Sequence, residues 1–307
     1  MLSRVAEQLY WMARYLERAQ NLARRLNVMT VLSVDSSRPE DAWARLLGEL
    51  GETPGHVADL DDMSMLHHLT FDPACSVSVA WGVRHARDNA RLVRDIVSRE
   101  IWQLLSQMKT TLDVPADWGA QPDGNGCAEV LNQVTLHAHA VEGLIDSTIL
   151  RDEGYHWLQI GVLLERTLST LHVLLAYADL WQAASGLEPT IAMAILKSVT
   201  SYGAFRRAYR TSLGARDILE FLLFEGGFPR SVAGGLAALR AAVAALPEPA
   251  PALRQSLGRL AAQVVYDGID QVEAVGARSY LWTLSDRIGQ VHGDLSARYF
   301  QPEVVEA

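Results

Sequence analysis

The stretch Tyr10-Trp11-Met12-Ala13-Arg14-Tyr15-Leu16-Glu17-Arg18-Ala19 lies within residues 3–27, whose pattern is that of one long amphipathic helix. At about 100° per residue, the apolar residues of this segment fall on one face without a break. That face consists of Val5, Leu9, Met12, Leu16, Ala19, Ala23 and Leu26. A continuous apolar stripe of this kind packs into a helical core.

The opposite face of the same helix carries charges. Arg14, Glu17 and Arg18 stand three and four residues apart, which places one carboxylate among several guanidiniums. The border of this face is aromatic and consists of Tyr10, Trp11 and Tyr15. Large rings beside charges indicate a face that meets another helix, a partner or a ligand. The residues leave two interpretations open, a salt-bridge lattice or a functional surface.

A related phrase recurs much later in the chain. Leu164-Glu165-Arg166 repeats Leu16-Glu17-Arg18, again inside a long helical pattern. A repeat so far apart predicts two similar helical halves rather than a short-period solenoid. The loop richest in Pro, Gly and Asp, residues 114–126, is the expected boundary between halves at 1–113 and 127–307, unless the chain is one continuous domain.

No alternating strand pattern is visible, so the sequence predicts an all-α protein, a large bundle of two similar antiparallel helical halves. Further helices are expected at residues 39–53, 77–112, 127–151, 154–185, 189–212, 214–224, from Pro229, and at 252–298. Gly268, Gly276 and Gly289 are expected to mark kinks or close packing in the last of these.

The expected helix 77–112 carries a second charged stripe. It consists of Arg84, Arg87, Asp88, Arg91, Arg94 and Asp95. If this helix lay beside the first one, Glu17 would meet Arg87 or Arg91. Arg166, Arg210 and Arg230 add further guanidiniums. Converging guanidiniums suit a carboxylate or phosphate ligand, and they equally suit a buried ion-pair lattice.

Composition narrows the class of protein. The chain has 307 residues, is 49% hydrophobic and carries a formal net charge of −9, which indicates a globular protein and argues against a general nucleic-acid binder. No apolar run reaches the length of about 20 residues that spans a bilayer, and no leader pattern opens the chain. Cys75 and Cys127 define no disulfide framework. A cytoplasmic protein is expected.

Motifs for catalysis are scarce. There is no Gly-rich phosphate loop, no dinucleotide fingerprint and no Gly-x-Ser-x-Gly, so no cofactor is predicted. Glu153 and His156 fit half of a di-metal motif once, without a second copy, and no metal site is predicted. If the protein is an enzyme, Glu17 or Glu165 is the candidate general base, with arginines holding an anionic substrate.

The opening residues, Met1 to Ala19, resemble the bacterial alpha-E domain family, described as a domain of unknown function. Supporting stretches are Ala86 to Asp95 with Glu100 and Trp102, Glu165-Arg166, Tyr209-Arg210 with Phe221, and Pro229 to Val232. The resemblance extends almost to Phe300. It departs at Gly161-Val162, where members often have Gly-Arg in a position that mirrors Arg14.

The resemblance implies an all-helical protein encoded beside a circularly permuted ATP-grasp protein and a transglutaminase-like protein. The first hypothesis is therefore a helical accessory or binding subunit of a peptide-modifying or amide-bond-forming system, working with an ATP-grasp ligase. A peptide or a small anion is a candidate ligand, and the helical surface leaves room for a homodimer. The expected binding residues are Tyr10, Trp11, Arg14, Glu17, Arg18, Arg84, Arg87, Asp88, Arg91, Arg94, Asp95, Arg166, Arg210 and Arg230.

Two alternatives remain. One is an enzyme acting on an anionic or peptide substrate, with a glutamate base in an Arg-rich helical cleft. The other is a purely structural protein whose ion pairs set the register of its helices.

Overall fold

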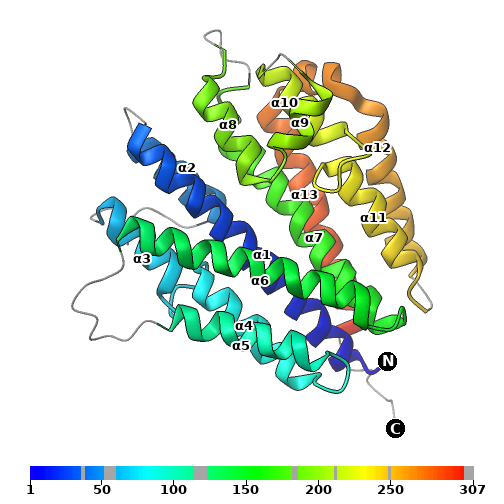
Figure 1. Cartoon of the computed structure of the whole chain (residues 1–307). Coiled ribbons are helices and arrows are strands. Elements are labelled where there is room, and N and C mark those ends of the chain that lie inside the picture. The colour runs from blue at the N-terminus through cyan, green and yellow to red at the C-terminus, as the bar shows by residue number, and fades with distance from the viewer. Residues whose placement is uncertain are drawn as a thin grey trace.

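The computed structural model describes residues 1–35, 39–51, 60–113, 123–181, 186–210, 213–247 and 250–300. Within these ranges all regular structure is helical and no strand occurs, which confirms the all-α prediction (Figure 1). The first helices are α1 (Ser3–Asp35), α2 (Pro39–Leu50), α3 (Asp62–Phe71), α4 (Val79–Leu92), α5 (Arg99–Leu112) and α6 (Gly124–Thr148). They are followed by α7 (Glu153–Ala176), α8 (Pro189–Ser198), α9 (Tyr202–Ala208), α10 (Ala215–Phe224), α11 (Val232–Ala244), α12 (Pro251–Val275), α13 (Ala277–Leu295) and a short π-helix, η2 (Ser296–Phe300).

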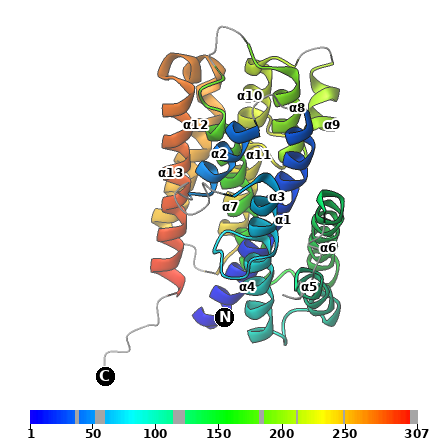
Figure 2. The same cartoon turned by 90° about the vertical axis from the view of Figure 1, so that its left-hand side faces the viewer.

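The long helix α1 is the centre of the fold. It packs mainly against α4, α6 and α7, and it runs between α3 to α6 on one side and α7 to α13 on the other (Figures 1 and 2). Its apolar stripe is buried as predicted except at Val5, which is half-buried, and Leu9, Met12 and Leu26 are fully enclosed. Its charged face is buried too, because α7 covers it. A helix enclosed on nearly all sides must therefore satisfy its charges inside the protein.

The helix expected at 77–112 is two helices. Its pattern breaks at residues 93–98, where α4 ends at Leu92 and the hydroxyl of Ser98 accepts a hydrogen bond from the amide of Ile101 to begin α5. A serine at this position caps a new helix more favourably than it continues an old one. The chain turns there, and α5 folds back against α4.

The expected helix at 252–298 also divides. Gly276 has a φ of 92° and separates α12 from α13, while Gly268, with a φ of 65°, kinks α12. These left-handed conformations interrupt the helix and are easily adopted only by glycine. Gly289 is different: it lies inside α13 with open space around its Cα, so it marks neither a kink nor a close contact.

Other boundaries shift by smaller amounts. The helix expected at 189–212 is split into α8 and α9 by residues 199–201, where Thr200 has a φ of 56°. Pro229 lies two residues before Ser231, the N-cap of α11, rather than in its first turn. Residues 114–122 of the expected boundary loop lie outside the described residues, and residues 124–126 form the first turn of α6.

The two halves of the chain repeat a local arrangement. Ser78-Val79-Ala80-Trp81-Gly82 opens α4 and Ser231-Val232-Ala233-Gly234-Gly235 opens α11. Each serine hydroxyl caps its helix and also donates to the carbonyl oxygen six residues before it. Gly82 lies against Ala19 of α1, and Gly235 lies against Thr167 of α7. The repeat therefore relates α1 and α4 to α7 and α11.

The packing groups α6 with the N-terminal helices, since α6 contacts α1 and α5. The loop in which the sequence placed the boundary therefore precedes a helix that packs with the N-terminal ones.

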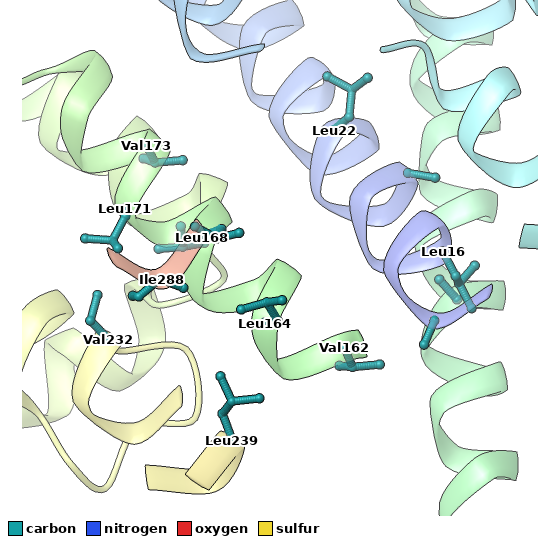
Figure 3. Close-up of a cluster of buried hydrophobic side chains, with 14 of the residues drawn as sticks. Leu16, Leu22, Val162, Leu164, Leu168, Leu171, Val173, Val232, Leu239 and Ile288 are labelled. Atoms are coloured by element: carbon teal, nitrogen blue, oxygen red, sulfur yellow. The ribbon is translucent and has the colours of Figure 1, made fainter. Parts of the chain in front are cut away.

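A single hydrophobic cluster connects the halves, with α7 at its centre. Figure 3 shows Leu164, Leu168 and Leu171 of α7 between α1, α11 and α13. By length and composition alone α7 is apolar enough to cross a membrane, but 72% of the relevant window is buried inside the fold. Its apolar character is thus that of a central core helix.

Candidate functional site

The site begins where α1 and α7 cross. A Cβ placed on Gly161 of α7 would lie 2.5 Å from the carbonyl oxygen of Tyr10 and 2.9 Å from the Cβ of Ala13. Only a glycine permits this approach of the two backbones. The close crossing directs the Leu-Glu-Arg phrases of α1 and α7 toward each other.

The two phrases exchange ion pairs. Arg166 donates to both carboxylate oxygens of Glu17, at 3.0 Å from Nε and 2.9 Å from Nη2. Arg18 donates in the same two-pronged way to Glu165, at 2.7 Å from Nε and 3.1 Å from Nη2. The expectation that Glu17 would meet Arg87 or Arg91 was therefore wrong, because α7 rather than α4 covers this face of α1.

Each glutamate also receives a second guanidinium. Arg14 donates to Glu165 at 2.8 Å from Nε, and Arg230, just before α11, donates to Glu17 at 3.2 Å. Val162 occupies the position that would mirror Arg14 in α7. A valine cannot pair with Glu17, so Arg230 supplies the second arginine of Glu17 from the residues just before α11. We refer to Arg14, Glu17, Arg18, Glu165, Arg166 and Arg230 as the Glu-Arg lattice.

The lattice holds both glutamates ionised. Burial raises the pKa of Glu17, but the charges of Arg166 and Arg230 outweigh it and lower that pKa to about 2. Burial likewise raises the pKa of Glu165, and Arg14 and Arg18 bring it down to about 2. A general base works best with a pKa near the operating pH. These carboxylates are suited to ion pairing, and their low basicity argues against either candidate as a general base.

The aromatic border of α1 meets other helices of the same chain. The hydroxyl of Tyr10 lies 2.8 Å from Nδ1 of His292 on α13, and the two rings are stacked. Trp11 stacks on Tyr15, which meets Trp81 of α4 edge to face. The rings thus seal the lattice at one end. Arg14 contributes to this seal, with its guanidinium 5.0 Å from the centre of the Trp11 ring.

The second charged stripe is separate from the lattice and lies on the surface. Its exposed members are Arg84, Asp88, Arg91, Arg94 and Asp95, and Arg87 is half-buried. Arg87 and Arg94 both lie over the ring of Trp102 on α5, at 4.6 and 4.8 Å from its centre.

The stripe borders a groove of about 700 Å³ between α3, α4 and α5. Its lining includes Arg84, Arg87, Asp88, Arg91, Lys109 and Phe71. We call this feature the α4–α5 groove. Most of the predicted site residues therefore lie in or beside the buried lattice or in the surface groove, and Arg94 and Asp95 lie just after α4, outside the lining of the groove. Arg210 belongs to neither, because it is exposed just beyond α9.

Several participants in the buried site are not among the expected binding residues, although the helical pattern places Asn21 and Arg24 on the charged face of α1. Asn21 donates to Glu17 at 3.2 Å, and its side-chain oxygen accepts from both Arg24 and Arg230. Glu142 of α6 accepts from Arg166 at 2.9 Å. Asn21 and Arg24 follow Glu17 by four and seven residues, so helical spacing was the available signal. No spacing could have indicated Glu142, which comes from another helix.

Among the residues that the structure describes, no group of three or more His, Cys, Asp or Glu side chains is placed to hold a metal ion. The carboxylate of Glu153 accepts from the indole of Trp157 at 3.3 Å. Cys75 is half-buried and Cys127 is buried, and burial raises the pKa of the Cys127 thiol to about 11.

The sequence pattern of the alpha-E family, described as a predicted alpha-helical domain with a conserved ER motif, matches residues 1–300. The chain belongs to the alpha-E family. The Glu-Arg dipeptide occurs in this alpha-E domain at residues 17–18 and 165–166, the two positions that exchange ion pairs between α1 and α7.

Similar proteins are known from mycobacteria. Uncharacterized proteins of Mycobacterium bovis and of Mycobacterium tuberculosis strain CDC 1551 are each 26% identical to this chain over 319 residues. The alignment covers 95% of this chain and 35% of each relative, so the alpha-E domain spans about a third of their length. No solved structure matches the chain.

Proposed function

We propose that this alpha-E domain is a non-catalytic binding subunit of a peptide-modifying or amide-bond-forming system in the bacterial cytoplasm. In this proposal it docks an ATP-grasp ligase, and a transglutaminase-like protein is a further partner. The family resemblance supports these partners. The observation that carries a docking role is the exposed α4–α5 groove.

The buried lattice is unsuited to docking a protein. Arg14 and Glu17 are only 6% and 3% exposed, and their charges are already paired. Binding a macromolecule there would require α1 and α7 to separate, which would open the core. The docking surface therefore lies outside the lattice.

The α4–α5 groove, unlike the lattice, presents charged side chains at the surface of the protein. Arg84 and Arg91 are exposed, and Arg87 is held over Trp102 by a cation–π contact. A guanidinium held in place loses less side-chain entropy on binding. Charged rims steer partners of opposite charge and set orientation more than affinity. The groove thus fits a partner segment that carries carboxylates.

The length of the relatives supports cooperation with other domains. Because the alignment covers only 35% of each mycobacterial relative, the alpha-E region in those proteins is joined in one chain to other sequence. This arrangement in the relatives supports the proposal that the alpha-E domain of the present chain docks a separate protein.

The test is a pull-down of the tagged chain from its own host, with captured proteins identified by mass spectrometry. We expect the wild type to recover an ATP-grasp protein and the variant Arg84→Glu/Arg91→Glu to lose it. A matched control, Arg254→Glu/Arg259→Glu, reverses two exposed arginines of α12 and should retain the partner.

Two results would contradict this proposal. Equal recovery by both reversed variants would exclude docking at the groove. Recovery of no ATP-grasp protein by folded wild type at native levels would exclude the partnership.

A further inference from the structure

Arg24 is a buried cation with an unused donor. It follows Glu17 by two helical turns on α1 and is 8% exposed. Its Nη1 donates to the side-chain oxygen of Asn21 at 3.1 Å. Its Nη2 is buried and has no hydrogen-bond partner in the part of the chain that the structure describes. A buried charged donor without an acceptor is costly, and it calls for an explanation.

A second guanidinium uses the same acceptor. Nη1 of Arg230 donates to the Asn21 oxygen at 3.1 Å, so Arg24 and Arg230 share one neutral oxygen. Arg166 is held beside them, because it and Arg230 both donate to Glu17. Three guanidiniums therefore gather around a single fully buried carboxylate.

The positive charge here is not fully compensated. Burial lowers the pKa of Arg24 to about 9, and the charge of Arg230 adds to the shift. The other half of the repeat differs at the position that matches Arg24, since the seventh residue after Glu165 is His172. Burial lowers the pKa of His172 to about 4, so that side chain is neutral. A third guanidinium, that of Arg24, is thus particular to the Glu17 side of the lattice.

The cluster reaches solvent at α6. Glu142 accepts from Arg166 at 2.9 Å while 34% of its side chain remains exposed. His139, one turn earlier on α6, is exposed, and the charges of Arg24 and Arg230 help to lower its pKa after the larger effect of burial. Glu142 is therefore a partly exposed carboxylate at the solvent side of a buried cationic cluster.

We propose that Arg24, Arg166 and Arg230 bind an oxyanion group of a ligand, a carboxylate or a phosphate, which enters past Glu142. Guanidinium forks match the spaced oxygens of both groups. The ligand oxygen accepts from Nη2 of Arg24, and the ligand replaces Glu142 on Arg166. This site goes beyond docking at the α4–α5 groove and does not depend on it, because the two share no residue.

The test is titration of the full-length protein with inorganic phosphate and, separately, with glutarate. Melting temperature and binding heat are followed, with sodium chloride at matched ionic strength as the reference. We expect a saturable rise in melting temperature with at least one anion. The anion with the lower Kd identifies the phosphate or carboxylate class.

Two variants assign the response to this cluster. Arg24→Met should abolish the saturable response and should not lower the melting temperature in anion-free buffer, because it removes an uncompensated buried charge. Glu142→Gln should lower the Kd by about two- to fivefold, which corresponds to loss of a competing, partly exposed ion pair. Arg216→Met, which breaks pairs with Asp270 and Glu273 on α12, should leave the response unchanged.

The proposal is overturned if folded wild type gives no saturable response to either anion, or if Arg24→Met binds with the wild-type Kd. If Arg24→Met does not fold, Glu142→Gln decides the question. An unchanged or higher Kd in that variant overturns the site.

Discussion

At the scale of single residues, the lattice is a set of swapped ion pairs with no unpaired carboxylate in it. Glu17 and Glu165 each accept from two arginines. Arg166 of α7 and Arg230 donate to Glu17, and Arg14 and Arg18, both of α1, donate to Glu165. Desolvation offsets much of the Coulomb gain in such pairs. Loss of one partner is nevertheless severe, because the remaining charges stay buried.

We expect Glu165→Gln to lower the free energy of unfolding by about 3–5 kcal/mol, since it leaves Arg14 and Arg18 without a full counter-charge. Urea denaturation followed by circular dichroism measures the change. The matched control is Asp179→Asn, whose pair with Arg45 is partly exposed and should contribute no more than about 1 kcal/mol. A loss of similar size in both variants would contradict the buried-pair account.

At the scale of elements, the crossing of α1 and α7 sets which charges meet. Gly161 lets the two backbones touch, and the ion pairs on either side of the crossing then specify one register. A slide of α7 by one turn toward the start of α1 would bring Arg166 toward Arg14, and a slide the other way would separate both glutamates from their arginines. The lattice thus selects the helix register more than it stabilises the fold, the role expected of buried charges.

Gly161→Ala should destabilise the protein by about 1–3 kcal/mol, because the new methyl group meets the Tyr10 carbonyl and cannot displace the backbone cheaply. The control is Gly143→Ala, in the exposed face of α6, where nothing lies within 4 Å of the new Cβ. That change should stabilise by about 0.5–1 kcal/mol. Thermal melts compare the two, and equal melting temperatures would show that the crossing tolerates a side chain.

At the scale of the whole molecule, one hydrophobic core and the Glu-Arg lattice join the two halves. The titration of a few buried groups therefore changes the stability of the entire fold. The pKa of Glu17 and Glu165 is about 2 in the fold, against an ordinary value of 4.5. Their stabilising pairs are intact above pH 4.5 and are lost as the pH falls toward 2. His172 acts in the same direction. Its pKa falls from 6.5 to about 4 on folding, so protonation favours the unfolded chain between these values.

The melting temperature should therefore be level above about pH 6.5, fall between pH 6.5 and 4, and fall more steeply below pH 4.5. Calorimetry across this range provides the measurement. His172→Gln should flatten the upper part of the curve and leave the lower part. A melting temperature that does not change between pH 6.5 and 4 would contradict the buried neutral histidine.

The sequence by itself determined that the chain is helical and identified many of the residues of the buried lattice. Helical period and the absence of alternating runs are local properties, and they identified an all-α chain and the apolar stripe of α1. Local spacing also brought Arg14, Glu17 and Arg18 together on one face. It missed the break at Ser98, because a cap interrupts a helix without changing its hydrophobic pattern. It marked Gly276 as a kink or close contact, and the positive φ of that glycine in fact separates two helices.

Only the tertiary structure decided which charges pair. Glu17 and Arg166 are separated by 149 positions, and Arg230 reaches Glu17 from 213 positions away. The sequence placed α4 opposite the charged face of α1, whereas α7 lies there. Helical periodicity states which side chains share a face and carries no information on which helix covers it. Which helix covers the charged face depends on the backbone contact at Gly161. It also depends on the buried charges, because each needs a counter-charge from another helix.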